Sequence, residues 1–261
     1  PLAGFLYLFV ALPLFGANAV FLLERIFKQK FEYLEYFSLS LAIAMVFPPL
    51  LLTLESTAGI LVPELPLLNT ALLFLATLWL RIPTVGRIAR PISHSIRVLP
   101  TVLIATFIYA VFLFALVTAY PFLPDSDPYY WLLKVRGEAE QLSLPTLQLY
   151  RPLFSSFVYI VHQTGGFELI TIFKYILPFL FILVLFPLTL IARLFSSRIM
   201  QLVLFLIPFS SASFLLYSTM PIPQSILNIV LTYFICLLLH AYFSKNVFFY
   251  FFSGSLLLPM Y

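Results

Sequence analysis

Long, nearly continuous apolar runs alternate with short polar segments along the whole chain. A membrane-spanning helix needs about 20 apolar residues, and seven runs reach or approach this length. They lie at about residues 6–23, 37–54, 67–80, 98–120, 169–192, 200–217 and 225–240. An eighth run begins at Val247 and is cut short by the end of the sequence. The pattern therefore predicts about eight spans, the last one truncated.

The apolar runs are rich in Leu, Phe and Ile and show no regular alternation of apolar and polar positions. Membrane strands show such alternation over segments of about ten residues. A continuous run favours a helix, because a helix pairs its own N–H and C=O groups where no water reaches them. The predicted fold is all-α: a polytopic transmembrane helix bundle with a long external loop bearing interfacial helices.

The composition agrees with this pattern and excludes several classes of protein. Of the 261 residues, 62% are hydrophobic and 9% are charged, whereas about 25% are charged in a typical soluble domain. So few charges cannot cover a water-facing surface, which excludes soluble and disordered proteins. We find no Gly-rich phosphate loop, Cys/His metal spacing or nucleic-acid module, so no nucleic-acid partner is expected. The single cysteine, Cys236, excludes a disulfide within the chain.

The placement of Lys and Arg predicts the orientation, because cytoplasmic loops carry an excess of these residues. Most of the fourteen basic residues lie in loops 25–31, 81–97, 193–198 and 241–246. We place these loops in the cytoplasm and the opposite loops, which hold most of the acidic residues, outside. The chain is then a multi-pass integral membrane protein that begins outside, and we expect it in a prokaryotic cell membrane.

The basic loop at residues 81–97, which contains two prolines, divides the chain into two predicted units. Residues 1–95 form a three-span N-terminal membrane unit that ends with this cytoplasmic loop. Residues 96–261 form a second membrane domain, which we expect to be truncated at its C-terminus. The sequence begins without a Met and ends inside an apolar run, so we expect an internal piece of a longer protein.

The external loop of the second domain, residues 120–168, is much longer than the other connections, and connections of this length are usually functional or disordered. Its many aromatic residues argue against disorder. Residues 144–162 mix apolar and polar positions, as a helix lying in the membrane interface does. Gly165 and Gly166 then predict a turn before the next span.

Candidate chemistry begins at the start of this loop, in residues 125–131 (DSDPYYW). Two carboxylates two residues apart can share a divalent cation, or one can act as a base while the other orients it. Basic side chains on the same side of the membrane suit a phosphate or diphosphate: Lys134, Arg136, Arg151 and Lys174. The alternative to a binding site is an ordinary external loop. In that case the aromatic residues lie in the membrane interface and the Lys and Arg side chains reach lipid headgroups.

The stretch DSDPYYWLLKVR, residues 125–136, resembles the first external loop of the GT-C membrane glycosyltransferases. This superfamily includes the catalytic subunit of oligosaccharyltransferase and the protein O-mannosyltransferases. Tyr150-Arg151-Pro152 and the outer turn 219–224 resemble later segments of the same pattern, so the resemblance covers roughly residues 97–241. The chain departs from the pattern in lacking a counterpart of the long C-terminal half, and its basic residues after the aromatics are displaced to Lys134 and Arg136.

This resemblance implies a glycosyltransferase that moves a sugar from a polyprenyl-phosphate or polyprenyl-diphosphate donor to an acceptor protein, glycan or lipid at the extracytoplasmic face. The implied catalytic residues, which would bind Mg²⁺ or Mn²⁺ in a reaction of the oligosaccharyltransferase kind, are Asp127 and Asp125. The implied ligands of the donor phosphate, which would stabilise the charge on the leaving group, are Lys134, Arg136, Arg151 and Lys174. The residues implied to stack on the sugar or to anchor the loop are Tyr129, Tyr130 and Trp131.

Two other classes of function stay open at this stage. A membrane transporter or lipid flippase would place polar sites near the bilayer midplane, with broken helices and inverted repeats. The charges here gather in the loops and no repeat is visible, which argues against transport. A non-catalytic membrane scaffold subunit would fit a chain without the C-terminal half.

Several polar residues outside the loop are expected to be structural. His240 ends a predicted span, and Asn228 is expected to join two helices. His162 lies in the external loop, where it is a candidate ligand or proton-transfer residue. Glu32 and Glu35 belong to a predicted cytoplasmic interfacial helix among basic residues.

Overall fold

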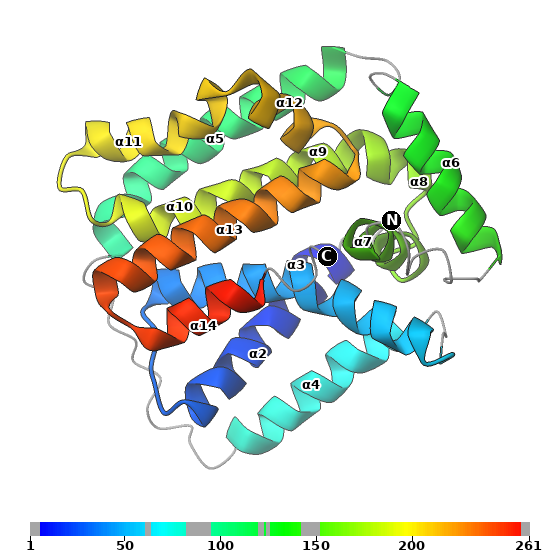
Figure 1. The fold of residues 1–261 in the computed structure, drawn as a ribbon, viewed down its shortest axis with the longest axis horizontal. Coiled ribbons are helices and arrows are strands. Elements are labelled where there is room, and N and C mark those ends of the chain that lie inside the picture. Colours follow the sequence, from blue (N-terminus) through cyan, green and yellow to red (C-terminus); the bar gives the residue numbers. More distant parts are fainter. Residues whose placement is uncertain are drawn as a thin grey trace.

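The computed structural model describes residues 6–60, 64–81, 95–119, 123, 126–141 and 152–256, and these residues contain helices and no strand. The helices form a bundle (Figure 1). Within the described residues, five helices are long and apolar enough to cross a membrane: Tyr7–Ile26, Tyr33–Glu55, Val98–Ala119, Leu169–Ala192 and Pro223–Ser244. The predicted all-α class is confirmed, and these apolar helices indicate an integral membrane protein.

The helices follow one another in a simple order along the chain. The first group is η1 (Tyr7–Ala11), α2 (Leu12–Ile26), α3 (Tyr33–Thr57) and α4 (Leu65–Arg81). Next come α5 (Ser95–Ala119), α6 (Ser126–Gln141) and α7 (Pro152–Gln163). The last group is α11 (Arg198–Leu206), η6 (Ile207–Ser210), α12 (Ala212–Thr219), α13 (Pro223–Ser244) and α14 (Val247–Ser255).

The span Leu169–Ala192, between α7 and α11, changes its helix type along its length. It consists of α8 (Leu169–Thr171), the π-helical η4 (Ile172–Ile176), α9 (Leu177–Phe179), the 3₁₀-helical η5 (Leu180–Val184) and α10 (Leu185–Ala192). Pro178 has no N–H to donate to the carbonyl of Lys174, four residues earlier. The departures from α-helical geometry on both sides of Pro178 follow from this missing hydrogen bond.

Three of the eight predicted spans do not form straight helices of spanning length. The apolar part of α4, Leu65–Trp79, is shorter than a span, and α14 has nine residues. Helices Arg198–Ser210 and Ala212–Thr219 are bent by 77° relative to each other. Ser211 lies at this bend with extended backbone and caps α12 by accepting a hydrogen bond from the N–H of Phe214. The described residues thus hold five candidate spans, or six if the bent pair is one span, and the predicted count of about eight is not confirmed.

Helices α6 and α7 lie at one end of the bundle and cross the direction of α5, α10 and α13 (Figure 1). Residues 153–161 of α7 are all buried, so α7 differs from the amphipathic interfacial helix predicted over residues 144–162. Its hydroxyl groups contact other helices: the Oγ atom of Ser156 lies 2.9 Å from Oγ1 of Thr53 in α3. Residues 142–151 lie outside the described part of the chain.

The turn predicted at Gly165 and Gly166 is confirmed, and His162 forms a hydrogen bond within it. The chain reverses at Thr164–Gly166, and Gly166 adopts a φ of +65°, which only glycine adopts readily. Nδ1 of His162 lies 2.6 Å from the carbonyl oxygen of Phe167, to which it donates a hydrogen bond. This bond fastens the turn to α7, so His162 has a structural role.

Helix α3 contacts helices of both predicted units. On one side Gly16 of α2 packs against the backbone of Ser40, and the hydroxyl of Tyr36 donates a hydrogen bond to the carbonyl of Ala17. On the other side the hydroxyl of Ser38 donates to the carbonyl of Phe186 in α10 at 2.9 Å. The predicted N-terminal unit therefore packs directly against the second domain.

Polar side chains join further pairs of helices, as expected inside a membrane, where small and polar residues connect helices. The hydroxyl of Thr101 in α5 donates to Oε1 of Gln201 in α11 at 2.9 Å. Nδ2 of Asn228 in α13 donates to the hydroxyl of Ser218 in α12 at 3.1 Å. The prediction that Asn228 joins two helices is confirmed.

Candidate functional site

Asp127 and the aromatic residues 129–131, which follow the fourth predicted span, form the first turns of α6. Asp127 lies in the first turn and is exposed to solvent. A carboxylate in this position is stabilised by the partial positive charge of the helix N-terminus. Asp125 lies outside the described residues, so the predicted pairing of the two carboxylates stays a prediction.

Within the described part of the chain, no three His, Cys, Asp or Glu side chains gather to hold an ion. Asp127 alone offers one carboxylate, whereas Mg²⁺ is usually held by one or two carboxylates together with substrate phosphates. The prediction of Mg²⁺ or Mn²⁺ therefore stays open.

The remaining predicted residues of α6 are divided between its two faces. Successive residues of an α-helix are rotated by about 100°, so Asp127, Trp131 and Lys134 share one face. Tyr129 and Arg136 lie on the opposite face, and both are exposed. The structure therefore separates the two basic residues that were predicted to hold one phosphate, Lys134 and Arg136.

Trp131 anchors α6 to the bundle. Its side chain is 8% exposed, and its ring centroid lies 5.9 Å from that of Phe154 in α7 with the rings edge to face. Nζ of Lys134 lies 4.9 Å from the centroid of the Trp131 ring, which is cation–π geometry. Trp131 therefore positions Lys134, while Tyr129 and Tyr130 keep 39% and 60% of their surface exposed and are accessible to a ligand.

Lys174 lies at the same end of the bundle as α6. Helix α6 contacts α8, which continues into η4, where Lys174 is located. The ring of Phe154 connects the two elements, because it contacts Trp131 on one side and Phe173 on the other, both at 5.9 Å between centroids. A π-helical turn inside a longer helix often marks a functional site. Arg151, the fourth predicted phosphate ligand, lies outside the described residues.

An apolar cavity of about 470 Å³ is lined in part by Thr171 and Tyr175, which lie close to Lys174 in the chain. It lies between η1 and α2 on one side and the span Leu169–Ala192 on the other, and α3 and α7 complete its walls. Among the residues that line the cavity, the side-chain hydroxyls are those of Thr171 and Tyr175. Phe9 and Tyr175, which also line the cavity, are 70% and 46% exposed, so the cavity opens to the surface there.

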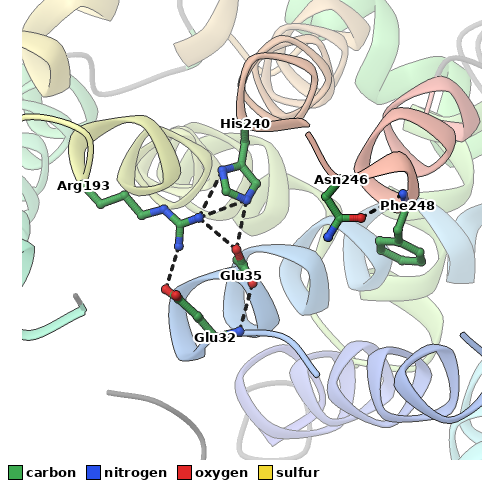
Figure 2. A network of polar contacts seen from close by, with 6 residues as sticks. All are labelled: Glu32, Glu35, Arg193, His240, Asn246 and Phe248. Atoms are coloured by element: carbon green, nitrogen blue, oxygen red, sulfur yellow. Dashed lines mark hydrogen bonds and ion pairs between the residues drawn. The ribbon is translucent and has the colours of Figure 1, made fainter. Parts of the chain in front are cut away.

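A cluster of ionic side chains (Figure 2) lies at the end of the bundle opposite α6, where α10 and α13 end (Figure 1). Arg193, at the end of α10, donates from Nη1 to Oε2 of Glu32 at 2.8 Å and from Nη2 to Oε1 of Glu35 at 2.9 Å. Nε2 of His240 in α13 lies 3.0 Å from the same oxygen of Glu35. With Nε2 donating to Glu35, Nδ1 of His240 accepts from Nη2 of Arg193 at 3.2 Å.

This cluster connects the ends of α3, α10 and α13, and the guanidinium of Arg193 binds both of its carboxylates. The contacts of His240 with Glu35 and Arg193 agree with the structural role that was expected for this residue. The residues of the cluster lie in or close to three segments that the distribution of Lys and Arg had placed on one side of the membrane, at residues 25–31, 193–198 and 241–246. Sequence patterns did not pair these residues, since about 160 positions separate Glu35 from Arg193, and only the shared side was predictable.

Comparison of the chain with protein-family models, with curated proteins and with solved structures found no match. The resemblance to GT-C glycosyltransferases over residues 97–241 therefore stays a hypothesis from sequence.

Proposed function

We propose that this chain is a membrane glycosyltransferase, or the membrane part of one, that uses a polyprenyl-phosphate or polyprenyl-diphosphate sugar at the extracytoplasmic face. One observation carries the proposal: Lys134 on α6 and Lys174 in η4 lie at the same end of the bundle, where α6 contacts α8, the segment that continues into η4. Cations at the level of lipid headgroups suit the phosphate of a lipid whose tail stays in the membrane. In this proposal the α6 end is external, and the end with Arg193 and His240 is cytoplasmic.

The proposed reaction assigns one step to each group. Asp127 accepts the proton of an acceptor hydroxyl, whose oxygen attacks the anomeric carbon of the sugar. The bond between that carbon and the phosphate oxygen breaks, and the lipid phosphate leaves with the bonding electrons. Lys134 and Lys174 stabilise the negative charge that develops on it. Tyr129 and Tyr130 offer exposed rings to the sugar, and Asp125, Arg151 and a divalent cation stay part of the proposal.

The separation of Lys134 from Arg136 on α6 allows a sharp test. Lys134→Ala removes a charged partner of the phosphate and is expected to weaken binding of farnesyl phosphate about tenfold. Arg136→Ala removes the same charge from the outward face of the same helix and is expected to leave the Kd within about twofold. The measurement is native mass spectrometry of the detergent-purified chain titrated with farnesyl phosphate. Equal Kd values for wild type and Lys134→Ala contradict the site.

Catalysis needs a separate readout, because binding alone does not show transfer. Asp127→Asn keeps the shape of the side chain and removes the base, so it is expected to abolish sugar transfer from a polyprenyl-phosphate sugar while binding of farnesyl phosphate is kept. Transfer is followed in detergent as release of polyprenyl phosphate. Full turnover by Asp127→Asn excludes Asp127 as the base.

A second function is favoured by one specific observation, the 77° bend between Arg198–Ser210 and Ala212–Thr219. Transporters often bind their substrates at discontinuous membrane helices. If the chain is a lipid flippase, fluorescent farnesyl phosphate will move between leaflets of proteoliposomes that contain the purified protein. Movement of this probe, together with no release of polyprenyl phosphate from a polyprenyl-phosphate sugar in the transfer assay, would favour the flippase over the transferase.

A further inference from the structure

The apolar cavity follows one face of the span Leu169–Ala192. The span residues that line it recur at helical spacing: Thr171, Tyr175, Ile176, Phe179, Leu180, Ile182 and Leu183. At 1.5 Å per residue the stretch from Thr171 to Leu183 covers about 18 Å. The cavity is therefore a groove that starts near the α6 end and continues into the membrane-spanning part of the bundle.

The opposite wall of the groove comes from the N-terminal part of the chain. It is formed by Leu8, Phe9, Leu12 and Pro13 at the start of the first span and by Leu41, Ala44 and Met45 of α3. A cavity of about 470 Å³ lies in the usual size range of ligand pockets, about 300–1,000 Å³. Its lining is almost entirely hydrocarbon and aromatic, so its occupant must be apolar along its length.

Lys174 lies near one end of the groove, although it is not one of the residues that line it. Lys174 neighbours Tyr175 in η4, and its Nζ lies 5.3 Å from the centroid of the Tyr175 ring, which lines the groove. Lys134 lies on α6, which contacts the preceding α8. Positive charge is thus placed at the end of the groove that reaches the edge of the membrane, and the deep end at Leu183 has none.

We propose that this groove holds the isoprenoid chain of a polyprenyl phosphate, with the phosphate against Lys174. The identity of the occupant rests on the proposed function. One apolar groove with a cationic end matches a lipid with a single chain and a compact anionic head. Five aromatic rings offer broad faces to the methyl branches of an isoprenoid: Phe9, Phe157, Phe167, Tyr175 and Phe179. The N-terminal spans are then part of the lipid site.

Photo-crosslinking tests the position of the chain. The whole chain is reconstituted in phosphatidylcholine nanodiscs with a polyprenyl phosphate that carries a diazirine within its isoprenoid tail. After irradiation we expect labelled peptides mainly from residues 8–13, 41–45 and 171–183. Labelling concentrated on the lipid-facing side of α5, where Leu103 and Phe107 are 62% and 69% exposed, overturns the proposal, because it describes bulk lipid.

A groove-filling variant tests occupancy without relying on labelling. Ile182 is half-buried and lines the deep part of the groove. Ile182→Trp fills space that about two methylene groups of the chain would occupy, and is expected to weaken binding of farnesyl phosphate about tenfold. Leu103→Trp adds similar bulk on the exposed face of α5 and is expected to change the Kd less than about twofold. Equal Kd values for the two variants overturn the proposal, and thermal unfolding shows that both are folded.

The head group has its own pair of variants. Lys174→Gln is expected to weaken binding of farnesyl phosphate about tenfold, Lys174→Arg restores it, and neither changes binding of farnesol more than about twofold. Competition with phosphatidylglycerol separates an isoprenoid site from a general anionic-lipid site. If phosphatidylglycerol displaces farnesyl phosphate at equal concentration, the isoprenoid assignment is wrong.

The outcomes separate this inference from the proposed function. Binding in the groove together with no sugar transfer supports the groove and leaves the transferase without support. Sugar transfer that Ile182→Trp does not affect, with labels outside the groove, supports the transferase and contradicts the groove.

Discussion

Arg193→Ala is expected to destabilise the protein by about 3 kcal/mol, because it leaves Glu32 and Glu35 without their cationic partner in the bundle. The side chains of Arg193 and Glu35 are 13% and 11% exposed, and Glu32 is 31% exposed. Partial exposure places the effect at the lower end of the usual range for breaking a buried ion pair, about 3–5 kcal/mol. For a chain of this size the midpoint of thermal unfolding in detergent should fall by about 10 °C.

Two further variants distinguish the loss of this ion-pair cluster from the general effect of removing one positive charge. Arg198 is exposed at the start of α11, so Arg198→Ala is expected to change stability by less than about 0.5 kcal/mol. Combining Arg193→Ala with Glu32→Gln and Glu35→Gln removes the unpaired carboxylates and is expected to recover part of the loss. If Arg193→Ala unfolds at the same temperature as Arg198→Ala, the cluster does not hold the three helices together.

The continuous spans were predictable because a helix that crosses a bilayer needs about 20 consecutive apolar residues. The run predicted at residues 169–192 coincides with the observed helix, and the run at 225–240 lies inside Pro223–Ser244. The bend at Ser211 was not predictable, because proline is tolerated in membrane helices where neighbouring groups satisfy the freed carbonyls. Whether Pro208 and Ser211 break the helix depends on the packing around them, which no local pattern records.

The burial of α7 shows a second limit of sequence patterns. The mixture of serines and aromatic residues over 153–161 is typical of a helix at an interface. In the structure Ser156 instead meets Thr53, which lies about a hundred positions earlier in the chain. A polar residue that faces a distant polar partner and one that faces water have the same local sequence, so only the tertiary fold separates the two cases.

The candidate site was predictable in part. The motif at residues 125–136 located α6 and its charged residues, and the helical period alone would have assigned Lys134 and Arg136 to different faces once a helix was assumed. Cation–π contact between Lys134 and Trp131 follows from the same spacing of three residues. The groove beside Lys174 was not predictable, because its walls come from five segments that only the fold brings together.

Gly16→Ala is expected to destabilise the protein strongly, because the added methyl group would overlap the backbone of α3. A Cβ atom at Gly16 would lie 1.8 Å from the carbonyl oxygen of Ser40 and 2.7 Å from its carbonyl carbon. Helices α2 and α3 would have to separate, which also breaks the hydrogen bond from Tyr36 to Ala17. Overpacking costs about 1–3 kcal/mol and occasionally more, and we expect the upper end, about 3 kcal/mol, since close backbone contact carries helix association in membranes.

The control is another helical glycine with free space around it. Nothing lies within 4 Å of a Cβ built on Gly137 of α6, so Gly137→Ala is expected to stabilise the protein slightly, by about 0.5–1 kcal/mol. Both variants are compared by thermal unfolding in the same detergent. Because the clash at Gly16 is with backbone atoms, trimming the neighbour with Ser40→Gly should not rescue Gly16→Ala. Rescue by Ser40→Gly, or a Gly16→Ala protein as stable as wild type, would mean that α2 and α3 are not in backbone contact at this point, and the wall of the groove that α2 and α3 form would lose its support.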